Sequence, residues 1–366
     1  MNTLQDIVII IPALDPEENL TPYCESLFSE GFRRFLLVDD GSADENKHIF
    51  QNSVNALREK GADARLLVHP VNKGKGRALK DAFADCAEHY GEEGYAVITA
   101  DSDGQHLTGD VKRIAEALLK DDDAILLGSR DFTRPDVPPR SKFGNILTSR
   151  VFRIFLGLQI SDTQTGLRGI PAKYLREMTT IRGERFEYET RMFVWAKQKN
   201  VKITELPIET VYENGNAGTH FNPFVDSFKI YGVIFGSFFT FAAGSLMGCV
   251  IDLALFSLFL RIFRGMTGIP LLTGKEILLS TVLARFISAA FHFLWTRKVV
   301  FASKKKPLTQ IVNYIVLMLS QMCASGILVT ALDAVFRAFL PTVVTKMIVD
   351  TTLFFVSYFI QKRFIF

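Results

Sequence analysis

Residues 95–106 read Tyr95-Ala-Val-Ile-Thr-Ala-Asp101-Ser-Asp103-Gly-Gln105-His106, and this stretch decides how the fold is interpreted. Its apolar, β-branched first half is typical of a buried strand. Strand alternation would direct the two carboxylates that follow to one side, at the strand end where open α/β sheets bind ligands. Because close carboxylates repel, a divalent cation is expected, and oxygen ligands from Asp101, Asp103 and Gln105 suit Mg²⁺ or Mn²⁺. Such an ion usually completes its shell with phosphate oxygens, which predicts a nucleotide diphosphate as ligand. Taken alone, an Asp-x-Asp pattern more often marks a polar turn that closes a strand, so the context decides.

The hydropathy of the chain divides its 366 residues into two parts. Up to about Asp226, short apolar runs alternate with charged helical stretches, as in a soluble α/β domain. Four long apolar segments follow, as in an integral membrane protein. We therefore expect a soluble domain over residues 1–229 and an all-α membrane domain of four transmembrane helices over residues 230–366.

The charge and the cysteines exclude several classes of protein. A formal net charge of +3, without a basic stripe interleaved with aromatics, gives no case for nucleic acid as a partner. The four cysteines are scattered, which predicts neither a zinc site nor a disulfide framework. The first residues lack a basic, signal-like segment, so the soluble part is expected to stay in the cytoplasm.

Strands alternate with helices in the soluble part, and polar motifs follow the strands. The expected strands cover residues 6–11, 35–38, 64–68, 95–100 and 124–127. This alternation predicts a Rossmann-like, mostly parallel sheet. Asp39 and Asp40, just beyond the second strand, could accept hydrogen bonds from a ribose hydroxyl or a base. Helix capping by Ser42 or Asp44 is the alternative.

A glycine-rich stretch, residues 72–78, follows the third strand. Its glycines would let the backbone approach a ligand, and Lys73, Lys75 and Arg77 lie at a helix N-terminus, where anions are stabilised. The spacing is not that of a Walker phosphate loop. A solvated cluster of charges at a helix start is the alternative.

Six motifs occur together in the soluble part. They are Pro12…Asp15, Asp39-Asp-Gly-Ser42, Asn72-Lys-Gly-Lys-Gly76, Asp101-Ser-Asp-Gly-Gln-His106, Gly128-Ser-Arg130 and Asp162-Thr-Gln-Thr-Gly-Leu-Arg168. In order and spacing they resemble a family 2 glycosyltransferase with the GT-A fold, and most of all its dolichol-phosphate mannose synthase and polyprenyl-phosphate glucosyltransferase branch. The resemblance covers about residues 6–230. Where the branch usually has Asn-Glu, this chain has Asp15-Pro16, so the acid is displaced to Asp15 or Glu17. A Gln-x-x-Arg-Trp motif is missing, which favours transfer of a single sugar.

The resemblance implies a role for each motif. Donor contacts would come from Pro12, Ala13, Asp15, Glu17, Asp39, Asp40, Lys75, Asp101 and Ser102. The metal, Mg²⁺ or Mn²⁺, would be held by Asp101, Asp103 and Gln105, with Asp103 also counted as catalytic. The acceptor phosphate would be clamped by Arg130, Arg140 and Arg168, and Asp162 would orient an arginine or the sugar. The implied donor is a UDP-sugar such as UDP-glucose, with GDP-mannose as the alternative, and the implied acceptor is undecaprenyl or dolichyl phosphate.

The chemistry of such an acceptor needs little from the protein. A phosphate monoester is largely dianionic near pH 7, so it can attack an anomeric carbon without a general base. The protein must bring two anions together with cations, for which arginine has the right planar geometry. Direct attack predicts inversion of configuration at the anomeric carbon.

Three further segments of the soluble part have open interpretations. Residues 147–158 place Val151, Ile154, Phe155 and Leu158 on one helical face, which would lie either on a bilayer surface or against the protein core. The acids of residues 186–189, at the start of a helix, could contact the sugar. Residues 211–223 resemble the mobile loop that covers the donor site in this branch.

The four expected spans lie near residues 237–260, 277–295, 311–335 and 343–360. Basic residues between the second and third spans, and in the tail, place both on the cytoplasmic side by the positive-inside rule. This predicts a multi-pass protein of the cell (inner or plasma) membrane with its catalytic domain in the cytoplasm. The oligomeric state stays open, a homo-oligomer included.

Residues 293–301 and 358–366 repeat one pattern at an offset of 65 residues, which predicts two related hairpins. The pattern resembles the GtrA-like family of four-span membrane proteins over about residues 235–366. The same offset relates Arg285 to Asp350, both inside expected spans. With Asp252 and Asp333, these charges mark either a polar path, as in a translocator of glycosylated lipid, or structural ion pairs.

Overall fold

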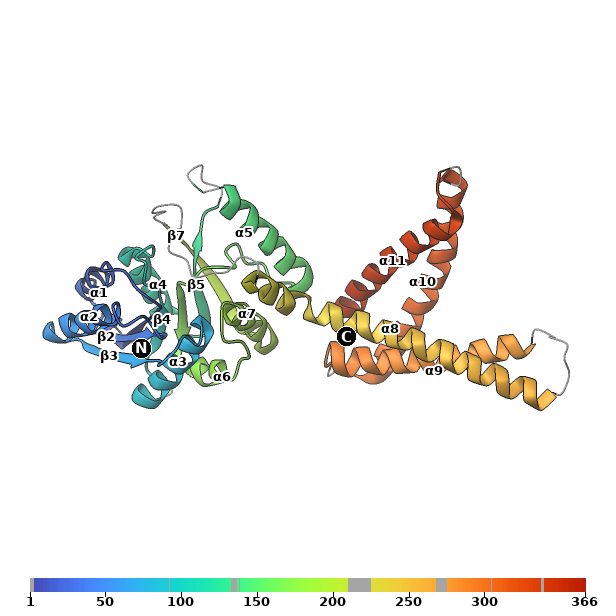
Figure 1. Cartoon of the computed structure of the whole chain (residues 1–366), viewed down its shortest axis with the longest axis horizontal. Helices are drawn as coiled ribbons and strands as arrows, with labels where there is room; N and C mark the ends of the chain where they lie inside the picture. Colours follow the sequence, from blue (N-terminus) through green and yellow to red (C-terminus); the bar gives the residue numbers. More distant parts are fainter. Residues whose placement is uncertain are drawn as a thin grey trace. The chain divides into compact units, whose positions relative to one another are not determined.

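The computed structural model describes residues 3–91, 93–132, 137, 139–209, 225–267, 275–303, 305–336 and 339–366. The chain forms two compact units, Met1–Ile234 and Phe235–Phe366. The first is an α/β unit and the second is all-α (Figure 1).

The first unit is built on a single sheet. In the described residues it has seven strands in the order β3-β2-β1-β4-β6-β5-β7. Their bounds are β1 Ile7–Ala13, β2 Arg34–Asp39, β3 Asp63–Val68, β4 Ala96–Thr99, β5 Ala124–Arg130, β6 Arg168–Pro171 and β7 Lys202–Ile208. All pairings are parallel except those of β6, which runs antiparallel to both β4 and β5. The predicted fold class, a mostly parallel α/β sheet, is confirmed.

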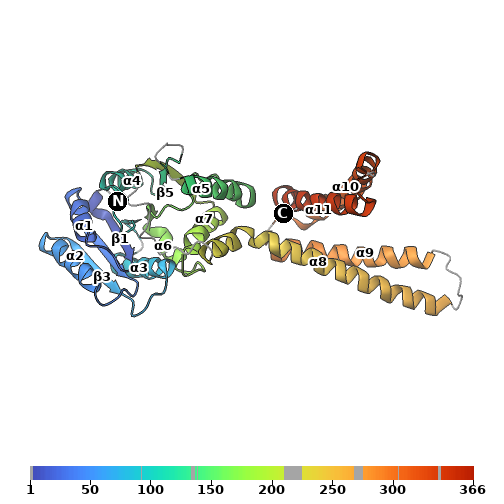
Figure 2. The same cartoon turned by 45° about the horizontal axis from the view of Figure 1, so that its top comes forward.

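Helices cover both faces of this sheet. Their bounds are α1 Leu20–Ser29, α2 Lys47–Glu59, α3 Lys75–Tyr90, α4 Thr108–Lys120, α5 Pro139–Val151, α6 Leu175–Thr179 and α7 Glu187–Lys199. Along β1, Ile7 and Ile9 pack into a core with α1, α2 and α4, while Val8 and Ile10 pack into a second core with α3, α6 and α7. Figures 1 and 2 show the same two layers of helices around the sheet. Because both faces are buried, the central strands are continuously apolar, which made them easy to predict.

The helix predicted over residues 147–158 is interrupted. Helix α5 ends at Val151 and a π-helical turn, Phe152–Leu156, follows. Each π turn shifts the side chains that come after it around the axis. As a result Phe152 is fully buried and Ile154 is 55% exposed. The predicted apolar stripe was therefore wrong at Ile154, whereas Val151, Phe155 and Leu158 do pack against the core.

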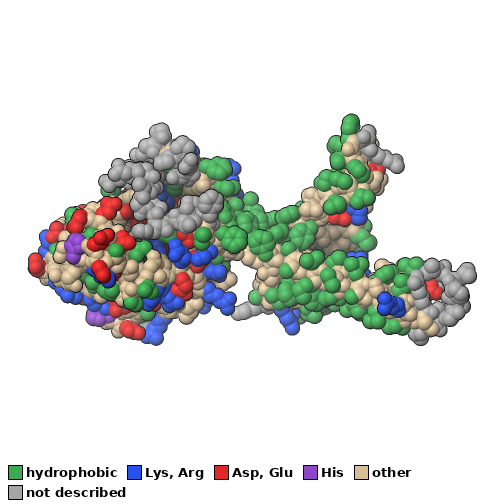
Figure 3. Space-filling view, in the orientation of Figure 1, with side chains coloured by type: hydrophobic (Ala, Val, Ile, Leu, Met, Phe, Trp, Pro, Cys, Tyr) green, Lys and Arg blue, Asp and Glu red, His purple; other side chains and the backbone are tan. Residues whose placement is uncertain are grey.

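The second unit contains the four long apolar helices expected from the sequence. They are α8 Val225–Thr267, which begins in the first unit, α9 Lys275–Trp295, α10 Pro307–Phe336 and α11 Thr342–Ile360. Among the described residues, four helices are long and apolar enough to cross a membrane. Hydrophobic side chains cover most of their visible surface (Figure 3). The chain is thus a multi-pass membrane protein.

The internal repeat is visible in the backbone of this unit. Helix α9 runs into the π-helical turn Thr296–Val300, and α11 runs into the π-helical turn Gln361–Ile365, at the same offset of 65 residues. The two ends meet, since the rings of Phe301 and Phe366 stack with centroids 5.6 Å apart. The two hairpins therefore end in equivalent structures.

Arg285, Asp252 and Asp350 find partners within their own halves of this repeat. The Arg285 guanidinium lies 3.2 Å from Asp252 Oδ2. Asp350 accepts hydrogen bonds from Ser325 Oγ at 2.6 Å and Lys346 Nζ at 2.8 Å. Arg285 thus pairs with Asp252 and not with Asp350, its equivalent by the repeat.

Candidate functional site

The Asp-x-Asp motif lies in a turn beyond the central strand β4. The strand ends at Thr99, and the chain turns through residues 102–104 with Gly104 at φ 75°. The expectation that strand alternation aims both carboxylates was therefore wrong, because both residues lie beyond the end of the strand. Gln105 N–H donates to Asp103 Oδ1 at 3.0 Å, and Asn19 Nδ2 donates to the Asp103 carbonyl oxygen at 3.1 Å. These bonds fix the turn against the loop after β1.

Asp101 is the electrostatic centre of the site. Its Oδ1 lies 2.7 Å from Lys75 Nζ and its Oδ2 lies 3.2 Å from His106 Nε2. Burial acts to raise the pKa of Asp101, but Lys75 and His106 outweigh it and lower that pKa to about 2. Burial lowers the pKa of His106 despite Asp101 beside it. Asp101 is therefore a permanent anion with a resident cation.

Asp103 differs from Asp101 in its surroundings. Burial first, and then the negative charge of Asp101, raise the pKa of Asp103. A divalent ion would relieve this repulsion, because oxygen donors of this kind suit Mg²⁺ and Mn²⁺. Among the described residues, His, Cys, Asp and Glu alone do not assemble a three-residue metal centre. The two carboxylates, whose repulsion a cation would relieve, nevertheless fit a divalent ion whose shell the Gln105 amide and phosphate oxygens would complete, and the Lys75 ammonium lies at hydrogen-bond distance from Asp101.

The segment of residues 162–168 walls the site on the side of Asp101. A Cβ on Gly166 would lie 2.3 Å from Asp101 Oδ2 and 2.6 Å from Oδ1, so any side chain there would have to displace the Asp101 carboxylate. Thr99 Oγ1 donates to the Gly166 carbonyl oxygen at 2.7 Å and holds this backbone in place. The motif that begins at Asp162 therefore shapes the carboxylate site directly.

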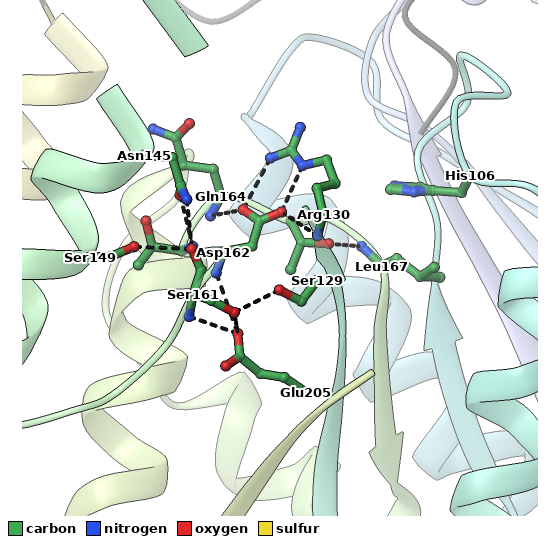
Figure 4. Close-up of polar contacts among 12 residues, drawn as sticks. His106, Ser129, Arg130, Asn145, Ser149, Ser161, Asp162, Gln164, Leu167 and Glu205 are labelled. Carbon is green, nitrogen blue, oxygen red and sulfur yellow. Dashed lines mark hydrogen bonds and ion pairs between the residues drawn. The ribbon is translucent and has the colours of Figure 1, made fainter. Parts of the chain in front are cut away.

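Arg130, the last residue of β5, is oriented by Asp162. Its Nε and NH2 donate to Asp162 Oδ2 and Oδ1 at 2.6 and 3.1 Å, a two-pronged pair (Figure 4). Asp162 is fully buried, whereas the Arg130 side chain is 20% exposed. Arg130 also contributes to lowering the pKa of Asp101. The guanidinium, partly exposed and fixed by Asp162, thus lies within electrostatic reach of Asp101.

Glu205 supports the Arg130–Asp162 pair by holding the backbone at Ser161 and Asp162, and no motif in the sequence predicted this role. From the edge strand β7, its Oε1 accepts from Ser161 N–H at 2.8 Å, from Ser161 Oγ at 2.7 Å and from Asp162 N–H at 3.3 Å. Asn145 Nδ2 donates to the Ser161 carbonyl oxygen at 2.6 Å (Figure 4). Both residues hold the backbone from which Asp162 projects.

The other predicted arginines are placed differently. Arg140 lies in α5, but its side chain is outside the described residues. Arg168 is 1% exposed, and its guanidinium donates to the carbonyl oxygens of Thr165 and Glu189 at 3.1 and 2.9 Å. The prediction that Arg168 contacts the acceptor phosphate is therefore corrected, because this arginine is buried under the site.

Asp39 and Asp40 also turn inward. Asp39 Oδ1 accepts from Ser42 N–H at 2.8 Å. Asp40 accepts from the backbone N–H groups of Lys73 and Gly74 at 3.0 and 2.8 Å, and its Oδ1 lies 2.7 Å from His69 Nδ1. With exposures of 2% and 4%, the two carboxylates hold loops together. A direct donor contact, predicted for both, is not available to Asp40 in this arrangement.

Asp15, the acidic residue in the loop after β1, also accepts hydrogen bonds from a neighbouring loop. Asp15 adopts φ 48°, and its Oδ1 accepts from Ala43 N–H at 2.8 Å and Asn46 Nδ2 at 3.0 Å. Pro12 and Ala13 are buried at the end of β1, whereas Glu17 is exposed and Ser102 is half-buried beside Asp101. Of the two candidates for the displaced acid, Asp15 therefore holds the loop together, and Glu17 is exposed to solvent.

The glycine-rich stretch accommodates protein and not a ligand. A Cβ on Gly74 would lie 2.5 Å from the Glu184 carbonyl oxygen, and one on Gly76 would lie 2.5 Å from Tyr188 Cβ. Arg77 Nε and Lys80 Nζ lie 2.6 and 2.8 Å from the Glu184 carboxylate. The expectation that these glycines admit a ligand is corrected: they admit the segment before α7. The loop of residues 211–223, with His220, lies outside the described residues.

Comparisons with known proteins match each of the two units to a protein family. Residues 8–179 match the model of Glycosyl transferase family 2, and residues 240–366 match that of the GtrA/DPMS transmembrane domain. The UDP-N-acetylglucosamine–dolichyl-phosphate N-acetylglucosaminyltransferase of Methanococcus voltae is 27% identical over 62% of this chain and 93% of its own length. Glycosyltransferase AglJ of Haloferax volcanii is 24% identical over 64% of this chain and 71% of its own length. The crystal structure of M. tuberculosis glucosyl-3-phosphoglycerate synthase aligns with a TM-score of 0.44 at 15% identity, over 63% of this chain and 79% of that one.

Proposed function

Because the chain joins a glycosyl transferase family 2 domain to a GtrA/DPMS transmembrane domain, we propose that it transfers one sugar from a nucleotide diphosphate sugar to a polyprenyl phosphate. The observation that supports this proposal is the Arg130 guanidinium, which is fixed by Asp162 and close enough to Asp101 to lower its pKa. In this proposal Arg130 would bind the acceptor phosphate, and the Asp-x-Asp turn would bind the donor diphosphate. The M. voltae relative is named for a dolichyl-phosphate acceptor and a UDP-linked donor. UDP-N-acetylglucosamine therefore joins UDP-glucose as a candidate donor, with GDP-mannose as the alternative.

The residues of the chain divide the work of this reaction. Asp101, Asp103 and Gln105 would hold the ion, and Mg²⁺ or Mn²⁺ supplies charge neutralisation for the departing diphosphate when bound. Arg130 holds the acceptor phosphate, and Asp162 fixes the plane of its guanidinium so that little ordering remains to be done on binding. A dianionic phosphate oxygen forms the new bond to the anomeric carbon without a base as the bond to the diphosphate breaks, and this single displacement inverts the configuration.

The membrane unit keeps the enzyme beside its lipid. Arg297, Lys298, Lys305 and Lys306, with Lys362 and Arg363, flank the spans on one side, which the positive-inside rule assigns to the cytoplasm. The soluble unit precedes the first of four spans and so faces that same side. Tethering raises the effective concentration of a lipid acceptor without any added contact.

The test is to weigh the lipid product. Full-length protein in detergent is incubated with Mn²⁺, undecaprenyl or dolichyl phosphate, and UDP-N-acetylglucosamine, UDP-glucose or GDP-mannose in parallel. One donor is expected to raise the mass of the lipid by one sugar, and NMR of the product gives its anomeric configuration. Asp103→Asn should abolish the product, and Asp123→Asn, a change at an exposed acid outside the site, should not. Folded protein that yields no glycolipid with any donor would refute the proposal.

A cavity in the membrane unit favours a second function, the handling of the glycosylated lipid. The cavity, of about 370 Å³, is lined by apolar and polar residues from α8, α9, α10, α11 and the turn after α11, and the polar ones include Gln321, Ser325, Asp350, Ser357 and Gln361. Gln361 Nε2 donates to Ser357 Oγ at 2.9 Å, and Ser357 Oγ donates to Gln321 Oε1 at 3.2 Å. Among the described residues, Gln361 Oε1 is buried without a hydrogen-bond partner. Polar groups are expensive within a bilayer, so the polar groups among the mostly apolar residues of this cavity suit the hydroxyl groups of a headgroup.

Lipid translocation in proteoliposomes tests this second function. Gln321→Leu keeps the size of the side chain and removes its polar atoms, so it should slow the transfer of the glycolipid across the bilayer while sugar transfer continues. Thr330→Val is the control, because Thr330 is exposed and its hydroxyl donates to the Gly326 carbonyl oxygen of its own helix. Equal translocation rates in the wild type and Gln321→Leu would remove the support for this function.

A further inference from the structure

Lys75 lies between two carboxylates that come from different parts of the fold. Its Nζ is 2.7 Å from Asp101 Oδ1, after β4, and 3.4 Å from Glu189 Oε1, in the first turn of α7. The Lys75 side chain is 19% exposed and that of Glu189 is 10% exposed. Burial alone would lower the pKa of Lys75, but Asp101 and Glu189 outweigh it and raise that pKa. The ammonium is therefore charged, and it is shared unequally between its two neighbours.

One carboxylate oxygen of Glu189, Oε1, has no hydrogen-bond donor in this arrangement of the described residues. Within the described part of the chain, its Oε1 is buried and makes no hydrogen bond of acceptable geometry. The Arg168 guanidinium lies 3.8 Å away on the other side and leaves its NH2 without a hydrogen bond too. A buried carboxylate oxygen without a hydrogen bond is costly. A second state of the site, in which Glu189 Oε1 accepts a hydrogen bond, would account for its burial.

We propose that Glu189 is a positioning residue, which receives the Lys75 ammonium when a divalent cation takes its place on Asp101. The inference rests on the proposed function, since it assumes that the Asp-x-Asp turn holds the ion of a sugar nucleotide. An ammonium at hydrogen-bond distance from Asp101 Oδ1 competes with a divalent ion for this carboxylate, because the two cations repel. Lys75 Nζ needs to move by only about half an ångström to reach an ordinary hydrogen-bond distance from Glu189 Oε1.

The chain of alternating charges explains why the move is local. Arg168 is buried and anchored on the backbone of Thr165 and Glu189, so it keeps Glu189 in place from behind. Gly76, one residue after Lys75, packs directly on the backbone of Arg185 and on Tyr188 Cβ. The start of α3 and the start of α7 are thus locked together, and only the flexible lysine side chain has to turn. Without Glu189, the displaced ammonium would stay near the ion and weaken its binding.

Binding of Mn²⁺ alone, without nucleotide or turnover, tests the proposal. The concentration of free Mn²⁺ is followed by electron paramagnetic resonance during titration of full-length protein in detergent. Lys75→Ala removes the competing cation and should tighten binding roughly tenfold, and Glu189→Gln should weaken it by a similar factor. Lys73→Ala is the matched control, because it removes the same charge from an exposed position two residues away and should leave the Kd within about twofold.

The double variant Lys75→Ala/Glu189→Gln separates positioning from simple long-range attraction. If Glu189 acts through Lys75, its substitution has little further effect once the lysine is gone, so the two changes are strongly non-additive. If Glu189→Gln weakens Mn²⁺ binding equally in both backgrounds, the residue acts only through its charge and the proposal is overturned. The proposal is also overturned if Lys75→Ala leaves the Kd for Mn²⁺ unchanged. This second test needs no substitution of the buried Glu189.

The outcome is distinguishable from a failure of the proposed function. Wild-type protein that shows this coupling but forms no glycolipid would contradict the proposed function and keep the inference. Protein that forms glycolipid while Mn²⁺ binding ignores Lys75 and Glu189 would keep the function and overturn the inference. Rescue by Glu189→Asp, which restores a carboxylate on a side chain that is one methylene shorter, should bring the Kd for Mn²⁺ part of the way back.

Discussion

Replacing Gly166 by alanine tests the site where it is most crowded. The new Cβ would lie 2.3 Å from Asp101 Oδ2, more than an ångström inside ordinary contact. The backbone cannot withdraw, because Thr99 Oγ1 holds the Gly166 carbonyl oxygen at 2.7 Å. The Asp101 carboxylate must therefore move by about 1 Å and loosen its contacts with Lys75 and His106, which lie at 2.7 and 3.2 Å.

The expected result is a large loss of activity with a modest loss of stability. A displacement of about 1 Å at a reacting site costs roughly a hundredfold in rate, and overpacking of this kind costs about 1–3 kcal/mol of folding free energy. Glycolipid formation and the thermal unfolding of purified protein measure the two effects separately. Gly109→Ala is the matched control, since no atom lies within 4 Å of its added Cβ and alanine favours a helix. Full activity of Gly166→Ala would refute the reasoning about Asp101.

Three other substitutions or conditions have expected outcomes. Arg130→Lys keeps the charge but loses the two-pronged bond to Asp162, so kcat should fall roughly a hundredfold with the protein still folded; unchanged kcat would mean that Arg130 lies outside the reaction. The pKa of Asp101 is lowered to about 2, so its stabilising contribution is complete above about pH 4 and is lost as the pH falls toward 2; a site that loosens between about pH 6 and 5 in unfolding experiments would contradict this assignment. Asp40→Asn removes an acceptor for Lys73 or Gly74 N–H and should cost about 1–3 kcal/mol in unfolding measurements without changing the donor KM; a large rise in KM instead would restore Asp40 as a donor contact.

The parts of the fold that depend on local pattern could be predicted from the sequence. The five apolar strands β1 to β5 and the four long helices are recognisable because each is apolar over its own length, and both family resemblances inferred from the motifs are confirmed. The strands β6 and β7 were missed. β6 has four residues and is inserted antiparallel between β4 and β5, and no local sequence pattern predicts this arrangement. β7 is a half-buried edge strand without a strong apolar run.

Within the candidate site, the sequence identified which residues gather but not which way they face. Asp39 and Arg130 end β2 and β5, and Asp40 and Asp101 come just after β2 and β4, so all four lie at the carboxyl ends of strands that run in one direction. Whether a carboxylate turns to a ligand or to a neighbouring N–H depends on loops brought in from elsewhere. Asp40 is taken up by the loop of residues 73–74, and that contact is set by tertiary structure alone.

The glycine-rich loop shows how internal packing builds the electrostatics of the site. In a phosphate loop, glycine makes room for a ligand, but Gly74 and Gly76 make room for residues 184–188. This close approach sets the N-terminus of α3 against that of α7. As a direct result Lys75 comes to lie between Asp101 and Glu189, so the charge pattern of the site depends on two glycines that pack against protein. A side chain at Gly76 should therefore separate Lys75 from Glu189 before it affects any substrate, and Mn²⁺ binding should report that separation even in the absence of nucleotide.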